Sequence, residues 1–274
     1  MSNLSILNLG CGNKIHKECI NIDFVSNNPL VIPHNLSKGI PYPSEHFDVV
    51  YHSHVLEHFD RNGGIELIKE CHRVLKKNGV IRIVVPDLEE IVREYLYLLN
   101  KNITKDDLTS EYDYEWIKIE LIDQIARNKS GGEFLEYLFR EKVPNEEYIL
   151  NRIGYVAKNI RNAYKNKVKK ELSFTRRLIN NLNYNSIRNR LLSIILTKYE
   201  REALQIGKFR LSGENHYFMY DIFSLSKLLK SFNFKEIKKK TPYESIINNW
   251  SYYELDVKNG EVFDPKSLFL EAIK

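Results

Sequence analysis

The sequence predicts an α/β fold with a mostly parallel sheet that is covered on both faces and interrupted by a helical insertion. Two features predict this fold. An apolar strand-like run leads into the glycine-x-glycine turn of Gly10 and Gly12, and a second apolar run, residues 20–22, is followed by Asp23. Ligands of open parallel sheets bind outside the carboxyl ends of the strands, where glycine lets the backbone come close and an acid can accept hydrogen bonds from a ribose diol. The pattern therefore predicts a nucleoside site.

The rest of the core alternates strands with helices. Residues 62–76 carry apolar side chains at helical spacing, Asn78-Gly79 is typical of a helix C-cap, and Pro86 closes the strand that follows. Alternation of this kind, with apolar strands, indicates a parallel sheet with both faces covered. The expected strands are residues 4–9, 19–24, 31–34, 47–51, 79–85, 234–238 and 267–272, and a further helix is expected at 224–232.

Composition places the chain among ordinary globular proteins. Its 274 residues are 43% apolar, which is enough for a sizeable core, and its net charge is +5. The first residues lack the features of a signal peptide, and no apolar run approaches the ~20 residues of a membrane span. Three cysteines do not make a disulfide framework, so we expect a protein of the reducing cytoplasm.

Six motifs occur in order at residues 7–12, 21–23, 39–43, 47–50, 55–58 and 73–79, joined by 213–216 and 267–272 in the tail. With these motifs, over about residues 5–95 and 211–274, the chain resembles the class I S-adenosylmethionine-dependent methyltransferases. More narrowly, it is similar to the methyltransferase type 11 group, including bacterial members associated with surface-polysaccharide biosynthesis. The resemblance implies a Rossmann-like fold whose last strand is antiparallel, and S-adenosylmethionine as cofactor.

The resemblance also implies a division of the chain. We expect the cofactor-binding part of the methyltransferase core at 1–95, a helical insertion at 96–210 that serves as lid, substrate surface or oligomer surface, and the C-terminal part of the core at 211–274.

Site residues follow from the resemblance, position by position. Gly10, Cys11 and Gly12 would pass beneath the methionine part of the cofactor, Asp23 would hold the ribose hydroxyls, and His52, just past the fourth strand, would face the sulfonium. The full expected cofactor set is Leu9, Gly10, Cys11, Gly12, Asp23, Phe24, Asn35, Leu36 and His52. The expected substrate set is His58, Glu214, Tyr217 and Tyr220, with His54 and His216 as catalytic residues and no metal ligand.

Three positions depart from the family pattern. Asn8 replaces a frequent acid, Lys14 stands where a third glycine is common, and the link from Gly12 to Cys19 is too short for an ordinary crossover helix. We interpret that link as a truncated first helix.

Histidine suits proton removal from a hydroxyl acceptor, because its ordinary pKa of about 6.5 lies near neutrality. His54 and His58 are four residues apart and would share one face of a helix, with Glu57 as a structural hydrogen-bond acceptor. The same letters match the H-x-x-E-H pattern of inverted zinc peptidases, so a zinc hydrolase using His54, Glu57 and His58 stays a remote alternative.

The resemblance implies methyl transfer to an oxygen, on a sugar of a bacterial surface glycan or of its lipid-linked or nucleotide-linked precursor. Open alternatives are a small-molecule or lipid acceptor and a non-catalytic cofactor-binding or scaffolding protein. Residues 158–210 are strongly basic, and residues 178–199 could form an amphipathic interfacial helix; we rank a solvated face first, a lipid-linked substrate at the inner membrane face second and nucleic acid third. A homo-oligomer is a further option.

Overall fold

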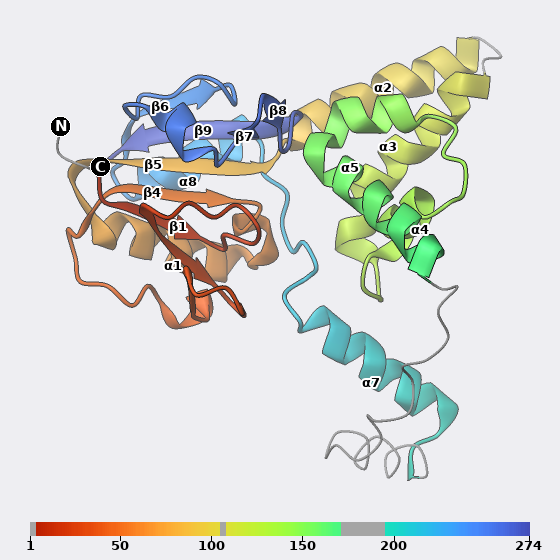
Figure 1. The fold of residues 1–274 in the computed structure, drawn as a ribbon, viewed down its shortest axis with the longest axis horizontal. Helices are drawn as coiled ribbons and strands as arrows, with labels where there is room; N and C mark the ends of the chain where they lie inside the picture. The colour runs from red at the N-terminus through yellow and green to blue at the C-terminus, as the bar shows by residue number, and fades with distance from the viewer. Residues whose placement is uncertain (1–3, 105–107, 171–194) are drawn as a thin grey trace.

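A seven-stranded sheet forms the centre of the protein. The computed structural model describes residues 4–104, 108–170 and 195–274, and its strand order is β3-β2-β1-β4-β5-β9-β6 (Figure 1). Neighbouring strands from β3 to β5 are parallel, whereas β9 is antiparallel to both β5 and β6. The expected mostly parallel sheet with an antiparallel last strand is confirmed. The strands are β1 (Ile6–Leu9), β2 (Cys19–Asp23), β3 (Val31–Pro33), β4 (Phe47–Ser53), β5 (Leu75–Pro86), β6 (Lys235–Lys240) and β9 (Ser267–Ile273).

Two amphipathic helices cover one face of this sheet. They are α1 (Arg61–Val74) and α8 (Ile222–Ser231), and each buries one apolar stripe. Leu67 and Ile68 of α1 and Leu225 and Leu229 of α8 join the buried strand residues in one cluster. This cluster is the main hydrophobic core.

A segment with a short 3-10 helix packs on the opposite face. Residues 245–256, which include the short 3-10 helix η3 (Trp250–Tyr253), pack Trp250 and Leu255 over the sheet. Beneath them, the fully buried guanidinium of Arg82 lies 2.7 Å from Asp256 and 2.6 Å from Glu271. Since an isolated buried charge is costly, this network explains how a charged residue can occupy the inner strand β5.

The insertion is helical in the part that is described. Its elements are α2 (Leu88–Thr104), α3 (Leu108–Ala126), α4 (Gly132–Leu138), α5 (Glu146–Lys170) and α7 (Lys198–Arg210). Helices α2 to α5 contact one another at the end of the sheet where β5 passes into α2 (Figure 1). They have their own apolar clusters, around Trp116 and around Leu98. The insertion therefore packs as a second layer beside the carboxyl ends of the strands.

Most of the predicted interfacial helix, residues 178–199, lies outside the described residues, as do Arg176, Arg177, Arg188 and Arg190. Among the helices that are described, none has both the length and the apolar character needed to cross a membrane.

Two local expectations are wrong. The helix expected to end at Asn78-Gly79 ends at Val74, because Leu75 turns to an extended backbone and pairs with Phe47. The connection between β1 and β2 contains turns and no helix, rather than a truncated helix.

Candidate active site

The turn after β1 requires glycine at position 10, where a side chain would clash with a neighbouring residue. Gly10 and Gly12 have φ angles of 57° and 51°, in the left-handed region that favours glycine. A Cβ on Gly10 would lie 2.3 Å from Cγ2 of Val55, whereas a Cβ on Gly12 would meet nothing within 4 Å. The turn thus packs against the segment after β4 at Gly10 and leaves open space at Gly12.

Asp23 is fixed at the end of β2 by two backbone donors. The amide of Gly12 donates to Oδ2 at 2.7 Å, and the amide of Phe24 donates to Oδ1 at 2.7 Å. Each carboxylate oxygen can accept a further hydrogen bond. The pair of oxygens can therefore receive the two hydroxyls of a ribose, and with the open space at Gly12 it fits the nucleoside end of S-adenosylmethionine.

The Asn8 departure has a structural reason. Its buried side-chain amide donates to the Lys14 carbonyl at 2.7 Å and to Oδ1 of Asn21 at 3.0 Å. Asn21 in turn donates to the carbonyl oxygens of His16, Cys19 and Leu30. A carboxylate at position 8 could not donate these two hydrogen bonds. Asparagine at this position therefore stabilises the connection between β1 and β2, which contains no helix.

Lys14 joins this link to the far end of the chain. Its Nζ lies 2.7 Å from Oδ2 of Asp264 and 2.8 Å from Oγ of Ser53. Burial raises the pKa of Asp264, but His54 and Lys14 outweigh it and hold that pKa below its ordinary range. The lysine that replaces a glycine thus anchors the floor of the site.

A cavity of about 570 Å³ extends from the glycine turn to the insertion. Its wall combines apolar rings with charged and amide groups from the core and from α2, α3 and α5. The lining includes Gly10, Cys11, Gly12, Lys14, Ser53, His54, His58, Glu120, Gln124, Arg127, Phe134, Arg152, Tyr155, Asn159, Glu214, His216, Phe263, Asp264 and Ser267. Both expected catalytic histidines line it.

His54 lies at the centre of this wall, with 31% of its side chain exposed. Its Nδ1 is 3.1 Å from Oε1 of Glu57, and its Nε2 is 3.1 Å from Oγ of Ser267. Burial lowers the pKa of His54, but the carboxylates of Asp264 and Glu57 outweigh burial and raise it above the ordinary value. The expected helix shared by His54 and His58 is wrong: His54 has φ 55°, and η2 (Leu56–His58) has only three residues.

Glu57 lies behind the histidines and is fully buried. Burial raises its pKa, but His54, His216 and His58 outweigh burial and bring the pKa to about 2, so the side chain is a carboxylate. Its backbone carbonyl accepts from the Tyr217 amide at 2.7 Å, which brings His216 beside His58, with ring centroids 4.8 Å apart. Burial lowers the pKa of His216 to about 3, so that imidazole is neutral.

His52 lies within β4, not just past its end as expected, because that strand continues to Ser53. Its imidazole is fully buried, burial lowers its pKa to about 4, and neither ring nitrogen has a hydrogen-bond partner among the described residues. It pairs with Leu9 in the sheet register. Its role toward a sulfonium stays a prediction.

The remaining expected site residues are not among those that line the cavity. Phe24 is 63% exposed beside Asp23, while Asn35 caps the 3-10 helix η1 (Leu36–Lys38). Tyr220 is buried in the main core, and the Tyr217 hydroxyl donates to the Arg210 carbonyl. Their cofactor and substrate roles stay predictions.

Several cavity residues carry no signal in the sequence. Arg127 directly follows α3 and Arg152 lies in α5, and Tyr155, Phe263 and Asp264 complete the wall. They share no motif and meet only through the packing of the insertion. The arginines and tyrosines of the insertion do not show in the sequence which of them will face the cavity.

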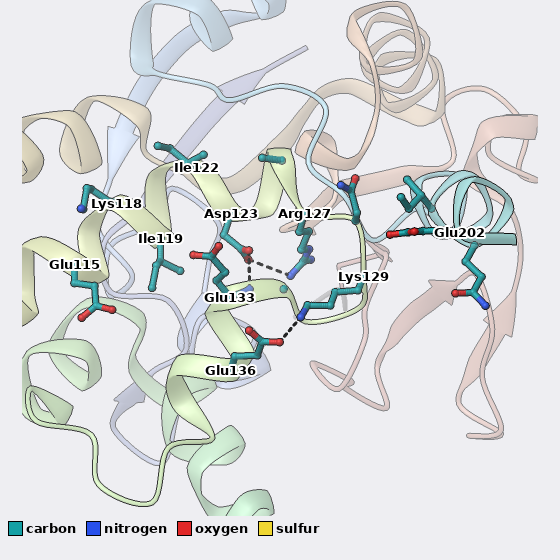
Figure 2. Close-up of a pocket in the computed structure, with 15 residues that line it drawn as sticks. Glu115, Lys118, Ile119, Ile122, Asp123, Arg127, Lys129, Glu133, Glu136 and Glu202 are labelled. Atoms are coloured by element: carbon teal, nitrogen blue, oxygen red, sulfur yellow. Dashed lines mark hydrogen bonds and ion pairs between the residues drawn. The ribbon is translucent and has the colours of Figure 1, made fainter. Parts of the chain in front are cut away.

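A second, larger cavity of about 840 Å³ lies within the insertion, between α3, α4 and α7 (Figure 2). Figure 2 shows its charged rim, where Lys129 pairs with Glu136 and the Asp123 carboxylate accepts from the Glu133 amide at 2.8 Å. Arg127 lines both cavities, but none of the expected site residues lines this one. We therefore assign the smaller cavity as the candidate active site.

Comparison with known proteins gives a family match over part of the chain. Residues 24–83 match a family model described as a methyltransferase domain. No curated protein sequence matches the chain. With the strand order and the fit at Asp23, the match supports an enzyme of the methyltransferase class with S-adenosylmethionine as its cofactor.

Solved structures with similarity are distant. The YcgJ protein from Bacillus subtilis is 20% identical, with a TM-score of 0.27, and the match covers 35% of this chain and 53% of that one. A SAM-dependent methyltransferase from Archaeoglobus fulgidus is 13% identical, with a TM-score of 0.39, over 100% of this chain and 87% of that one. A possible histamine N-methyltransferase from Thermotoga maritima is 12% identical, with a TM-score of 0.39, over 100% and 84%. The chain thus spans about half the length of the Bacillus protein, and at these TM-scores the likenesses add nothing to the sheet topology and the family match.

Proposed function

We propose that the protein transfers a methyl group from S-adenosylmethionine to a hydroxyl oxygen of a sugar, in a bacterial surface glycan or its lipid-linked or nucleotide-linked precursor. The observation that carries the proposal is the single cavity wall that joins the Gly10–Gly12 turn to His54. When bound, the cofactor supplies an activated methyl group on a positively charged sulfur. The Gly10–Gly12 backbone and the Asp23 carboxylate would hold it.

His54 is the proposed general base. Because its Nδ1 faces the Glu57 carboxylate, we assign the ring proton to Nδ1, which leaves Nε2 as the proton acceptor beside Ser267. Glu57 is buried and orients the ring, which limits the positions from which the imidazole can reach an acceptor hydroxyl. His216, neutral and on the same wall, would contact the acceptor.

The chemistry of the wall supports a sugar as acceptor. Tyr155 and Phe263 form an edge-to-face pair with ring centroids 5.1 Å apart, and Gln124 and Asn159 supply amides. Rings suit the apolar faces of a sugar and amides suit its hydroxyls. A cytoplasmic reaction, at the inner membrane face for a lipid-linked precursor, is part of the proposal and agrees with the basic composition of residues 158–210.

Cofactor binding is the first test. Calorimetric titration of the full chain with S-adenosylmethionine and S-adenosylhomocysteine should give micromolar binding, about −8 kcal/mol. Asp23→Ala should lose it, while Asp60→Ala, an aspartate at the start of α1, should keep it. No binding by the wild type, with the fold verified by circular dichroism, would contradict the proposal and leave the scaffolding alternative.

The acceptor is tested next, with cofactor labelled in its methyl group and a panel of nucleotide-linked sugars, lipid-linked sugars and unglycosylated lipids. Label should move to a sugar oxygen. His54→Gln should lower kcat by about 100-fold, the usual range for a lost general base, and leave cofactor affinity unchanged. Label on a lipid or on nitrogen would overturn the sugar hydroxyl assignment.

A further inference from the structure

Two side chains on the cavity wall and one directly behind them are grouped as metal ligands would be. Among the described residues, Glu57, His58 and His216 each place one potential ligand atom within 4.8 Å of the others. We propose that they bind a divalent transition-metal cation of the zinc type. The sequence led to a different triplet, His54, Glu57 and His58, but in the structure His216 takes the place of His54.

Two buried groups of this cluster have polar atoms that are not fully satisfied by the described residues. Glu57 is fully buried, and beyond its contact with His54 neither of its carboxylate oxygens has a hydrogen-bond partner in the described chain. His216 is 4% exposed, and its Nδ1 also lacks a partner there. Buried charges are normally paired, hydrogen-bonded or bound to a metal, so a cation between these groups would satisfy both.

The surroundings orient the third ligand. His58 lies with Nδ1 3.1 Å from the Asn215 carbonyl oxygen, which fixes Nδ1 as the donor and leaves the lone pair on Nε2. Metal-binding histidines characteristically donate their other ring N–H to a carbonyl or carboxylate. The same short segment carries Asn215 and His216, and the Tyr217 amide ties it to Glu57. A backbone hydrogen bond thus holds the segment with His216 against the segment with Glu57 and His58.

The donor set of two imidazoles and one carboxylate indicates which metal would bind and what it could do. This donor set suits zinc and similar transition metals, whereas magnesium prefers oxygen ligands. Three protein ligands leave a coordination position open, as in catalytic zinc sites. His58 and His216 line the cavity, so that position would face the acceptor. Its use in polarising an acceptor hydroxyl rests on the proposed function; the metal site itself rests on the cluster alone.

The test is direct metal binding to the metal-stripped full chain. Titration with Zn²⁺ by calorimetry, and with Co²⁺ by visible absorption, should show about one equivalent bound, with Mg²⁺ unable to compete. His216→Gln and His58→Gln should each weaken binding by more than about tenfold. His72→Gln, a histidine of α1 outside the cavity, is the matched control and should bind as the wild type does.

His58→Gln guards the test against a folding failure in the buried His216 variant, because His58 is only partly buried. No stoichiometric Zn²⁺ binding by the wild type, or wild-type affinity in a folded His58→Gln, would overturn the metal site. S-adenosylmethionine titrations of the same samples separate the two proposals. Cofactor binding without metal binding refutes only the metal site, and metal binding without cofactor binding refutes only the methyltransferase proposal.

Discussion

The connection from β1 to β2 contains no helix, whereas the connection from β4 to β5 contains η2 and the whole of α1. The first is held by side-chain amides: Asn8 and Asn21 bond to the carbonyl oxygens along residues 14–30. The second is held by regular helical bonds and an apolar stripe against the core. The first connection carries the cofactor turn and the second carries His54, Glu57 and His58. In this protein, a short irregular link replaces a crossover helix because buried side-chain amides donate hydrogen bonds to its backbone carbonyl oxygens.

The largest expected effect is at the point where the two connections touch. Gly10→Ala would place a Cβ 2.3 Å from Val55 in a left-handed backbone, so strain and overpacking add. We expect a loss of about 3 kcal/mol in the free energy of unfolding, measured with urea. Gly12→Ala, with similar φ and no neighbour within 4 Å, should lose only about 1 kcal/mol. Equal losses would show that the contact with Val55 does not matter.

The second prediction removes the amide that organises the first connection. Asn21→Ala should cost about 2 kcal/mol, because three carbonyl oxygens lose their donor in a buried site. Urea unfolding measures it. Asn27→Ala, at an exposed position of the following loop, is the control and should cost about 0.5 kcal/mol or less. A small effect at Asn21 would mean that the link does not depend on its amides.

The third prediction concerns the helical connection. Asp60 caps α1 by accepting from the Gly63 amide at 2.7 Å. Asp60→Ala should cost about 1 kcal/mol, the usual value of an N-cap, measured by thermal or urea unfolding. Asp60→Asn retains a capping side chain and should recover most of the loss. If Asp60→Ala lowered the free energy of unfolding more than Asn21→Ala does, the helical connection would depend more on a single side chain than the helix-free one.

The smallest effect is pH-dependent. Arg73 pairs with Glu70 at 2.7 Å and, with the Ile40 amide as a second donor, lowers the pKa of Glu70 below its ordinary value. A carboxyl group whose pKa is lowered on folding stabilises the protein above its unfolded-state pKa, and this stabilisation is lost as the pH falls through the folded-state pKa. Glu70→Gln should therefore cost about 0.5 kcal/mol at pH 7. The difference from wild type should shrink in acid, as measured by urea unfolding across pH. A constant difference would exclude the ionised pair as its source.

Much of the core could be predicted from the sequence, because strand and helix periodicities are local. The glycine turn, Asp23 and the antiparallel last strand lie where expected. The helix end at Asn78-Gly79 was wrong since pairing of Leu75 with Phe47, a long-range contact, ended the helix earlier. A helix-cap signal in the sequence is overridden when the preceding residues pair with a neighbouring strand.

The site was predictable only in part, for the same reason. His54 and His216 could be chosen from motifs, and both line the cavity. The meeting of His216 with Glu57 and His58 depends on a backbone bond from Tyr217 to Glu57, which no spacing encodes. Arg127 and Arg152 reach the cavity only through the packing of the insertion, whose helices carry no motif.

The position of β9 has a consequence for how the protein is made. This strand follows β6 in the chain, yet it lies between β5 and β6 in the sheet. Until residues 267–273 have left the ribosome, β6 has no partner in the main sheet, and the pairing of Lys14 with Asp264 can form only about then. Contacts of such sequence separation form late and slowly. A nascent chain thus carries an unfinished nucleoside pocket and an unpaired strand edge together, and both are completed by the same few residues.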